Sequence, residues 1–186
     1  MKYAALDLDR TLFNTDAFSG DLRRVCATIV GVSYDDFCRD TTGYKYISRE
    51  GLSHYDLFAQ LHMYGAVYSP KLVAAIKDGI LALQKSYIYK DVSAFITKLQ
   101  QNDYEIFILS FGETRYQTLK VQISPELQNL QFVVVQEPKS KYLSVYKGRQ
   151  GILFDDVEQE LLPSGWRSEL IDRQVHPNDA LIRLVL

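Results

Sequence analysis

The spacing of apolar residues changes along the chain, and the change predicts two kinds of structure. An apolar run over residues 3–8 predicts a short strand. Between residues 14 and 88 apolar residues instead recur three and four positions apart, as they do on the buried face of a helix. These residues are Leu22, Val25, Cys26, Ile29, Val30, Leu57, Phe58, Leu61, Leu72, Val73, Ile76, Ile80 and Leu83. We therefore expect a helical segment directly after the first strand.

Capping residues divide this segment into separate helices. Gly31 is typical of the end of a first helix, and Ser33 of the start of a short second one. Gly65 marks the end of a third helix. A fourth begins at Ser69 and Pro70, because serine is a good N-cap and proline suits the first helical turn.

After residue 89 strands and helices alternate. Apolar and β-branched runs predict strands at 105–109, 132–135, 151–154 and 169–172, and helices are expected to begin near residues 92, 113, 140 and 156. Alternation of this kind is typical of a parallel sheet with helices on both faces. The predicted fold is α/β, with a Rossmann-like parallel-sheet core formed by residues 1–13 plus 89–186. An all-helical cap, residues 14–88, interrupts it.

Composition places the chain among globular proteins. Of its 186 residues 47% are hydrophobic and 24% charged, which excludes a disordered or collagen-like chain. The two cysteines, Cys26 and Cys38, exclude a disulfide scaffold and favour a reducing, cytoplasmic location. Acidic residues interrupt the first apolar run, so we expect no signal peptide, and no apolar stretch reaches the roughly 20 residues of a membrane span.

Charge and aromatic content add two points. The chain has 21 basic and 23 acidic residues, and the net charge of -2 argues against a general nucleic-acid binder. Eight of the thirteen tyrosines lie between Tyr34 and Tyr89. Tyrosine can stack on a base or bond to a sugar hydroxyl, but most of these residues are expected to pack inside the cap. The predicted cap also contains the basic residues Arg23, Arg24, Arg39, Lys45 and Arg49.

Candidate chemistry lies at the strand ends, because parallel sheets bind ligands beyond the carboxyl ends of their strands. The first strand leads into Asp7 and Asp9, whose side chains share one side of an extended chain, and Thr11 follows. Two carboxylates this close repel each other unless a cation lies between them. The alternative is a strand that simply ends in a polar loop.

Three later strands end in further polar residues. Ser110 follows the 105–109 strand and can donate a hydrogen bond to a phosphoryl oxygen, or can simply form a turn. Lys139 or Lys141, after the 132–135 strand, offers a compact cation, although a solvated lysine is the ordinary alternative. Asp155 and Asp156 follow the 151–154 strand and suit Mg²⁺, or one of them caps a helix.

In this order, each at a strand end, these residues resemble the four motifs of the haloacid dehalogenase superfamily of phosphohydrolases. Those motifs are Asp-x-Asp-x-Thr, a strand-end Ser or Thr, a Lys before a helix, and an acidic pair. The resemblance runs from Asp7 to Glu160. It implies that the helical segment is the family's cap. It also implies a Mg²⁺-dependent phosphatase of a small phosphorylated metabolite, such as a nucleotide or sugar phosphate, with no nucleic-acid or membrane partner.

The resemblance also implies roles for individual residues. Asp7 becomes the nucleophile that forms an aspartyl-phosphate, and Asp9 the general acid and base, which requires surroundings that raise its pKa. Lys139 offsets charge on Asp7 and on the phosphate. The substrate-side residues are Ser110, which holds phosphoryl oxygens with a backbone N–H of Phe111 or Gly112, and Thr11, which braces the turn. Mg²⁺ is expected between Asp7, the backbone carbonyl of Asp9, and Asp156.

The match has departures and open alternatives. Lys139 is preferred to Lys141 because Leu143, four residues on, fits the family's spacing. The family often has Asn after the strand-end Ser, where this chain has Phe111, and Glu160 stands where Asp is frequent. Asp9 argues against the dehalogenase branch, which lacks that acid. Three alternatives stay open: a phosphomutase with the same aspartyl-phosphate, a phosphate-binding module without turnover, and a polynucleotide end phosphatase, which the acidic balance disfavours.

Overall fold

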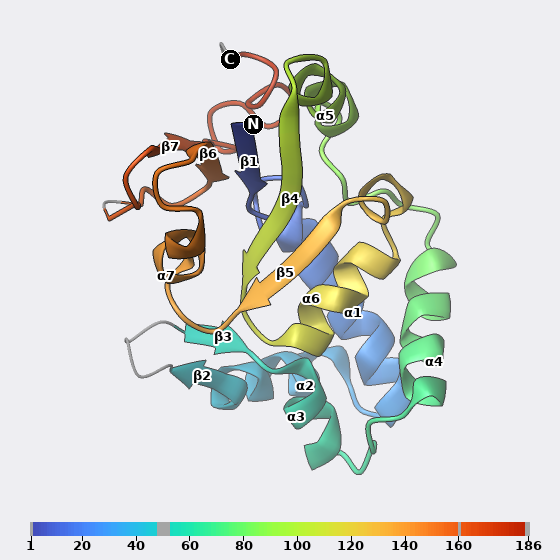
Figure 1. Ribbon diagram of the computed structural model, residues 1–186. Coiled ribbons are helices and arrows are strands. Elements are labelled where there is room, and N and C mark those ends of the chain that lie inside the picture. The colour runs from blue at the N-terminus through green and yellow to red at the C-terminus, as the bar shows by residue number, and fades with distance from the viewer. Residues whose placement is uncertain (1, 48–52, 160, 185–186) are drawn as a thin grey trace.

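A five-stranded parallel sheet forms the centre of the computed structural model, which describes residues 2–47, 53–159 and 161–184 (Figure 1). The strand order is β5-β4-β1-β6-β7. The strands are β1 (Lys2–Leu6), β4 (Tyr104–Phe111), β5 (Gln131–Val135), β6 (Gln150–Asp155) and β7 (Trp166–Leu170). The predicted α/β fold with a Rossmann-like parallel sheet is confirmed.

The first strand of the chain occupies the middle of the sheet. In register, Leu6 of β1 pairs with Ile108 of β4 on one side and with Phe154 of β6 on the other. Apolar residues suit this position because a central parallel strand is covered on both faces. The sheet therefore holds the residue that follows β1, Asp7, from both sides, and the Asp7 N–H donates to the Phe154 carbonyl at 2.8 Å.

Helices of the core connect the strands. They are α5 (Val92–Gln101), α6 (Thr114–Gln122) and α7 (Lys139–Leu143), with short 3-10 turns at η2 (Pro125–Leu127) and η3 (Ser144–Tyr146). The helix predicted near residue 156 is wrong. Asp155 instead closes a turn there, since its Oδ1 accepts a hydrogen bond from the Val157 N–H at 3.1 Å. The last strand, expected at 169–172, begins earlier, at Trp166.

The described residues between β1 and α5 form helices and one small sheet. The helices are α1 (Thr15–Val30), α2 (Tyr34–Asp40), η1 (Thr41–Tyr44), α3 (Leu57–Met63) and α4 (Pro70–Leu81). Gly31 ends α1 in the left-handed conformation, while Ser33 and Ser69 cap α2 and α4. The all-helical cap needs correction, because β2 (Lys45–Ile47) pairs antiparallel with β3 (Ser53–Tyr55). Strands of three residues are too short to show an alternating pattern.

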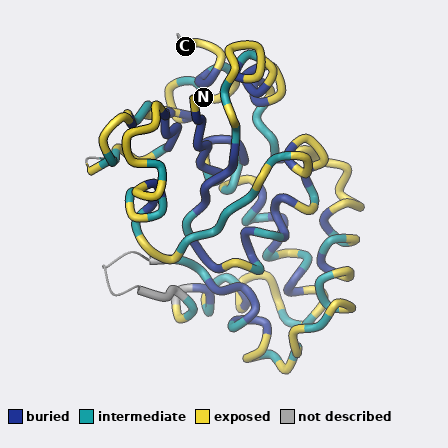
Figure 2. The backbone as a smooth tube through the Cα atoms, viewed as in Figure 1, coloured by how far each residue is buried: buried dark blue, intermediate teal, exposed yellow. Residues whose placement is uncertain are grey.

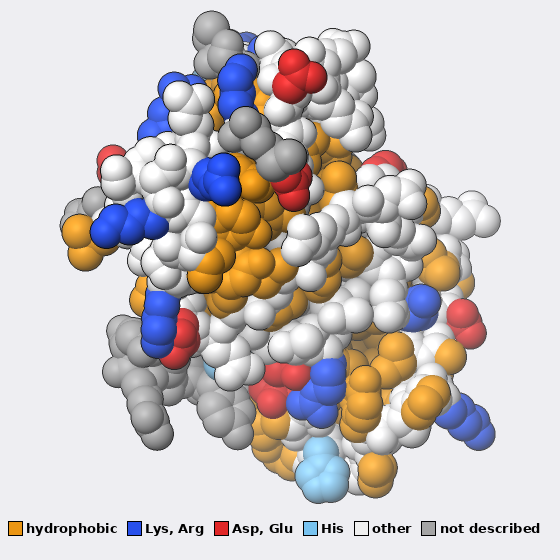
Figure 3. All heavy atoms as spheres, viewed as in Figure 1, with side chains coloured by type: hydrophobic (Ala, Val, Ile, Leu, Met, Phe, Trp, Pro, Cys, Tyr) orange, Lys and Arg blue, Asp and Glu red, His pale blue; other side chains and the backbone are white. Residues whose placement is uncertain are grey.

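Buried side chains form one cluster on each face of the sheet. Figure 2 shows that much of the backbone in the centre of the molecule belongs to buried residues. The larger cluster continues from the sheet into the inserted segment through Phe13, Phe18 and Phe37. The smaller one gathers Tyr3, Phe107 and Trp166 beneath α7. Figure 3 shows hydrophobic side chains at the surface over β4 and β5, where α7 leaves this face partly uncovered. Within the described ranges, the helices are all too short or too polar to cross a membrane.

A buried carboxylate ties the inserted segment to the chain that returns to the core. Asp21 of α1 accepts hydrogen bonds from Lys85 Nζ at 2.8 Å and from the Tyr87 hydroxyl at 2.9 Å. The bond from Lys85 lowers the pKa of Asp21 against the opposing effect of burial, and Tyr87 lowers it further.

We expect Asp21→Asn to lower the free energy of unfolding by about 1–2 kcal/mol at pH 7, because it loses charge-assisted hydrogen bonds. A depressed carboxyl pKa stabilises the fold above the unfolded value of 3.8 and ceases to do so as pH falls through the folded pKa. Urea denaturation of both proteins between pH 7 and pH 2 should therefore show curves that converge in acid. Asp78→Asn, on the exposed surface of α4, should cost little at any pH.

Candidate active site

A cavity of about 570 Å³ opens at the carboxyl ends of the central strands. The inserted segment lies across this end of the sheet, with α2, α3, β2 and β3 beneath the strand tips in Figure 1. Core residues in the wall are Asp7, Asp9, Phe111, Gly112, Tyr116, Gln117, Lys120, Lys139, Asp155 and Asp156. The inserted segment contributes Thr15, Ser19, Arg23, Thr41, His54 and Tyr55. This is where an open parallel sheet is expected to bind a ligand.

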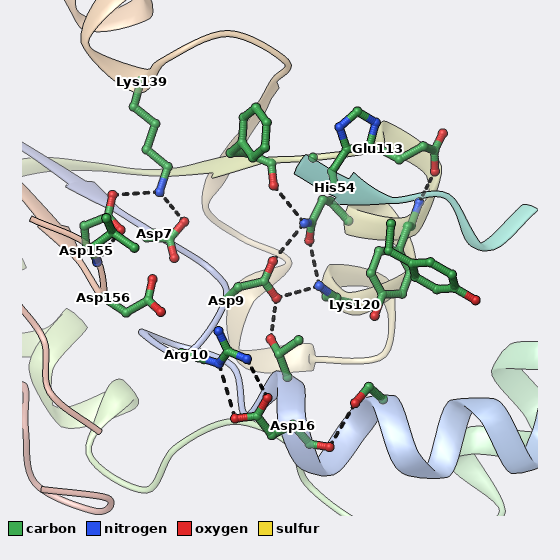
Figure 4. A pocket seen from close by; sticks show the side chains of 18 of the residues that line it. Asp7, Asp9, Arg10, Asp16, His54, Glu113, Lys120, Lys139, Asp155 and Asp156 are labelled. Carbon is green, nitrogen blue, oxygen red and sulfur yellow. Dashed lines mark hydrogen bonds and ion pairs between the residues drawn. The ribbon is translucent and has the colours of Figure 1, made fainter. Parts of the chain in front are cut away.

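Lys139 lies between two buried carboxylates (Figure 4). Its Nζ forms an ion pair with Asp7 Oδ1 and another, at 2.9 Å, with Asp155 Oδ2. The contact follows from the fold, because β1 and β6 are neighbours and α7 begins at Lys139. Lys141 points elsewhere, since its exposed side chain pairs with Glu137 at 2.7 Å. Of the two candidate lysines, Lys139 is the one in the cavity.

Three carboxylates come together at this point. Asp7, Asp155 and Asp156 each offer an oxygen within 4.8 Å of the others. Burial raises the pKa of Asp7, the positive charge of Lys139 opposes this increase, and the negative charge of Asp155 adds to it. The resulting pKa is about 8. Burial and Asp155 raise the pKa of Asp156 to about 6. A single lysine leaves this cluster with excess negative charge, and oxygen ligands of this kind suit a hard divalent cation.

The predicted metal ligands were Asp7, the Asp9 carbonyl and Asp156. The structure brings Asp7 and Asp156 together and adds Asp155, whose carboxylate also accepts hydrogen bonds from Lys139 and Gln159. The carboxylate of Asp9 faces the opposite wall of the cavity (Figure 4).

Asp9 is held by three side chains there. Its carboxylate accepts hydrogen bonds from Lys120 Nζ at 2.5 Å, from Gln117 Nε2 at 2.8 Å and from the Thr15 hydroxyl. Burial alone would raise the pKa of Asp9, but Lys120, Thr15 and Gln117 outweigh it and the net pKa is lowered. The expected raised pKa of Asp9 is therefore wrong in this arrangement, because a buried lysine from a distant helix stabilises the charged form.

Lys120 and Gln117 lie in the site but were not among the residues predicted from the sequence. Both are buried on α6, and Lys120 Nζ lies 4.2 Å from the centroid of the Tyr116 ring. Gln117 also donates to the Phe111 carbonyl at 3.0 Å. Gly112 makes room for this amide, because a Cβ there would lie 2.7 Å from Gln117 Nε2. One sequence feature could have indicated them: they are two polar residues three positions apart, on the helix that follows the strand-end Ser110.

The other predicted site residues divide into two groups. Phe111 and Gly112 line the cavity, although the Gly112 N–H already donates to the Val135 carbonyl at 3.0 Å. Thr11 and Ser110 are fully buried behind its wall, and in the described part of the chain their hydroxyls have no hydrogen-bond partner. The Thr11 carbonyl accepts from Arg173 at 2.7 Å, which fixes the turn. Roles for these residues in binding stay predictions, and Glu160 lies outside the described residues.

Cation binding can be tested without any substrate. At a Mg²⁺ concentration 100 times its dissociation constant, the free energy of unfolding should rise by about 2.7 kcal/mol, because only the folded chain brings the three carboxylates together. Thermal denaturation with Mg²⁺ or with EDTA measures this shift. Asp156→Asn should abolish most of it. Asp16→Asn should preserve it, since Asp16 also lines the cavity but pairs with Arg10 at 2.8 Å. A shift that survives Asp156→Asn contradicts the assignment.

Comparison with known proteins finds likeness in structure rather than in sequence. No family profile and no curated protein matches the chain. Its structure matches a phosphatase of the haloacid dehalogenase (HAD) class from Thermococcus onnurineus, with TM-score 0.58 and 16% identity over 93% of this chain and 87% of that one. It also matches the magnesium-bound HAD hydrolase YfnB from Bacillus subtilis, with TM-score 0.53 and 14% identity over 96% and 90%.

A third match is a haloacid dehalogenase-like hydrolase from Burkholderia xenovorans, with TM-score 0.55 and 17% identity over 83% of this chain and 72% of that one. Sequence identities this low support a shared fold but not a shared reaction. The reaction has to be inferred from the residues of the site. The chain therefore has the haloacid dehalogenase-like fold.

Proposed function

We propose that the chain is a Mg²⁺-dependent phosphatase that hydrolyses a small phosphomonoester through an aspartyl-phosphate on Asp7. The observation that carries the proposal is that Lys139 forms ion pairs with both Asp7 and Asp155 in one cavity, which Asp9 faces from the other wall. The matched hydrolases and phosphatases share the fold and support the same reaction class.

In the first step an oxygen of Asp7 forms a bond to phosphorus, and the bond from phosphorus to the ester oxygen breaks. Asp9, in its protonated form, gives its proton to the departing oxygen, so that an alcohol leaves. Lys139 offsets the negative charge of Asp7 and of the phosphoryl group as they approach. Because Lys120, Gln117 and Thr15 favour the charged form of Asp9, this step depends on how tightly they hold it.

In the second step a water molecule attacks phosphorus. The Asp9 carboxylate takes the proton of that water, and the bond between phosphorus and Asp7 breaks. Inorganic phosphate leaves, Asp7 is again a carboxylate, and Asp9 again carries a proton. The lowered pKa of Asp9 keeps its carboxylate unprotonated before the water attacks, and it also makes that carboxylate a weaker base.

Asp7, Asp155 and Asp156 would hold the cation. When bound, Mg²⁺ supplies positive charge to the phosphoryl oxygens on which negative charge is spread during transfer. The inserted segment leaves room for a small metabolite and limits entry of larger ones.

Release of inorganic phosphate from an aryl phosphate tests the proposal. Purified protein with Mg²⁺ should release phosphate, and EDTA should stop the release. A phosphomutase would instead return the phosphoryl group to the substrate and yield an isomer without free phosphate. A protein that binds phosphate esters without any turnover would be a phosphate-binding module on this fold. Either result overturns the phosphatase.

A further inference from the structure

One side of α1 runs along the cavity wall. Thr15, Ser19 and Arg23 are four residues apart and all three line the cavity. At 1.5 Å per residue, Arg23 stands roughly 12 Å along the helix from Thr15. The near end of this stripe lies at the proposed chemistry, because the Thr15 hydroxyl contacts Asp9. The far end carries a positive charge that the proposed reaction does not use.

Arg23 differs from the other cations of the cavity wall, because no acidic residue in the described part of the chain pairs with it. Arg10 pairs with Asp16, Lys120 with Asp9, and Lys139 with Asp7 and Asp155. For Arg23, which is half-buried, residues 2–47, 53–159 and 161–184 provide no ion pair or hydrogen bond. A guanidinium that is partly removed from water and has no counter-ion favours an anionic ligand, above all a carboxylate or phosphate that it can bind with two hydrogen bonds.

Two tyrosines, Tyr55 and Tyr116, line the same cavity as Arg23. Burial raises the pKa of both Tyr55 and Tyr116, and the positive charge of Arg23 acts in the opposite direction on each. The Tyr55 hydroxyl donates to Gln60 at 2.5 Å, so it is already engaged. The Tyr116 hydroxyl has no hydrogen-bond partner within the described residues, although the residue lines the cavity. It remains a donor for the ligand that Arg23 attracts.

We propose that Arg23 and Tyr116 form a second anion-binding subsite, so that the substrate carries an anionic group besides the phosphate that is removed. This inference rests on the proposed function, because it places the first phosphate at Asp7. A second phosphate and a carboxylate share the chemistry that a guanidinium and a phenol hydroxyl recognise. The two ends of the α1 stripe lie roughly 12 Å apart along the helix, a spacing that a small metabolite can span.

The kinetic test compares three substrates. A hexose bisphosphate and a phosphoglycerate each carry a second anion, while para-nitrophenyl phosphate carries none. Arg23→Gln should lower kcat/KM roughly 10- to 100-fold for the two-anion substrates, mainly through KM, and change the aryl phosphate less than about threefold. Loss with the bisphosphate alone identifies a second phosphate, and loss with the phosphoglycerate alone identifies a carboxylate. Equal losses on all three substrates, or no loss, overturn the subsite.

Arg24→Gln is the matched control. Arg24 is the next residue of α1, but its exposed side chain pairs with Asp21 outside the cavity wall. Its substitution should leave the ratio between two-anion and one-anion substrates unchanged. Arg23→Lys keeps the charge and should restore part of the loss, which a purely structural role of Arg23 would not require.

A binding experiment distinguishes failure of the proposed subsite from failure of the proposed phosphatase reaction. In an Asp7→Asn background, calorimetry should show a hexose bisphosphate binding at least tenfold more tightly than the corresponding monophosphate. Adding Arg23→Gln should remove this preference. If the preference is absent, the subsite is wrong even when phosphate release occurs. If it is present without phosphate release, the subsite stands and the proposed reaction is wrong.

Discussion

Asp7→Asn should abolish phosphate release, with a loss of turnover of at least about 10⁴-fold. An amide oxygen is a poor nucleophile, so the bond between residue 7 and phosphorus no longer forms. The position makes the effect specific, because the Asp7 backbone is bound to β6 and its side chain contacts Lys139. Initial rates with an aryl phosphate and Mg²⁺ measure the loss.

The same substitution should not unfold the protein. Asparagine has nearly the same shape as aspartate. Burial raises the pKa of Asp7, which means that ionisation of this carboxyl destabilises the metal-free fold at neutral pH, and asparagine does not ionise. We therefore expect an unchanged or higher melting temperature for Asp7→Asn in EDTA. A variant that melts normally and still releases phosphate at the wild-type rate excludes Asp7 as the nucleophile. Asp78→Asn, on the exposed face of α4, serves as the activity control.

Lys139→Met should have the largest effect on stability. It leaves Asp7 and Asp155 buried without the lysine that pairs with both, and loss of one member of a buried ion pair costs about 3–5 kcal/mol. Burial opposes the charge of Lys139, but the two aspartates outweigh it and raise the lysine pKa, so the wild-type side chain remains charged. Phosphate release should also fall by at least about 10³-fold. Denaturant unfolding in EDTA, together with initial rates, measures both effects.

Lys141→Met is the matched control, two residues along the same helix. Its side chain is exposed and pairs with Glu137, and surface pairs of this kind contribute about 0.5 kcal/mol. Stability and turnover should both remain close to wild type. Equal effects of the two substitutions would show that general loss of charge on α7, rather than the contact with Asp7, explains the result.

The fold was predictable where one residue pattern determines one element. Apolar runs followed by acidic residues predicted β1 and β6. Apolar residues three and four positions apart predicted α1 and α4, including their caps at Gly31 and Ser69. The pairing of β2 with β3 was not predictable, because three-residue strands carry no periodicity and depend on their partner. The helix expected after Asp156 failed because the same acids that favour a cap also close a turn.

The site was predictable where its residues follow strand ends, and less so where they lie on helices. Asp7, Asp155 and Lys139 come together because β1, β6 and the start of α7 converge. The ion pair of Asp9 with Lys120 joins residues 111 apart in the sequence. Local sequence carries no information about such a contact, so the direction of the Asp9 pKa could not be predicted from it.

The central place of β1 has a consequence for the order of events during synthesis. Residues 2–6 leave the ribosome well before their partners in the sheet, which are residues 104–111 and 150–155. The strand that carries the nucleophile must therefore wait, unpaired, until most of the chain has been made. Pairing over such sequence separations slows folding. During that delay the apolar segment before Asp7 stays exposed, and exposed apolar segments of incomplete chains are prone to aggregate.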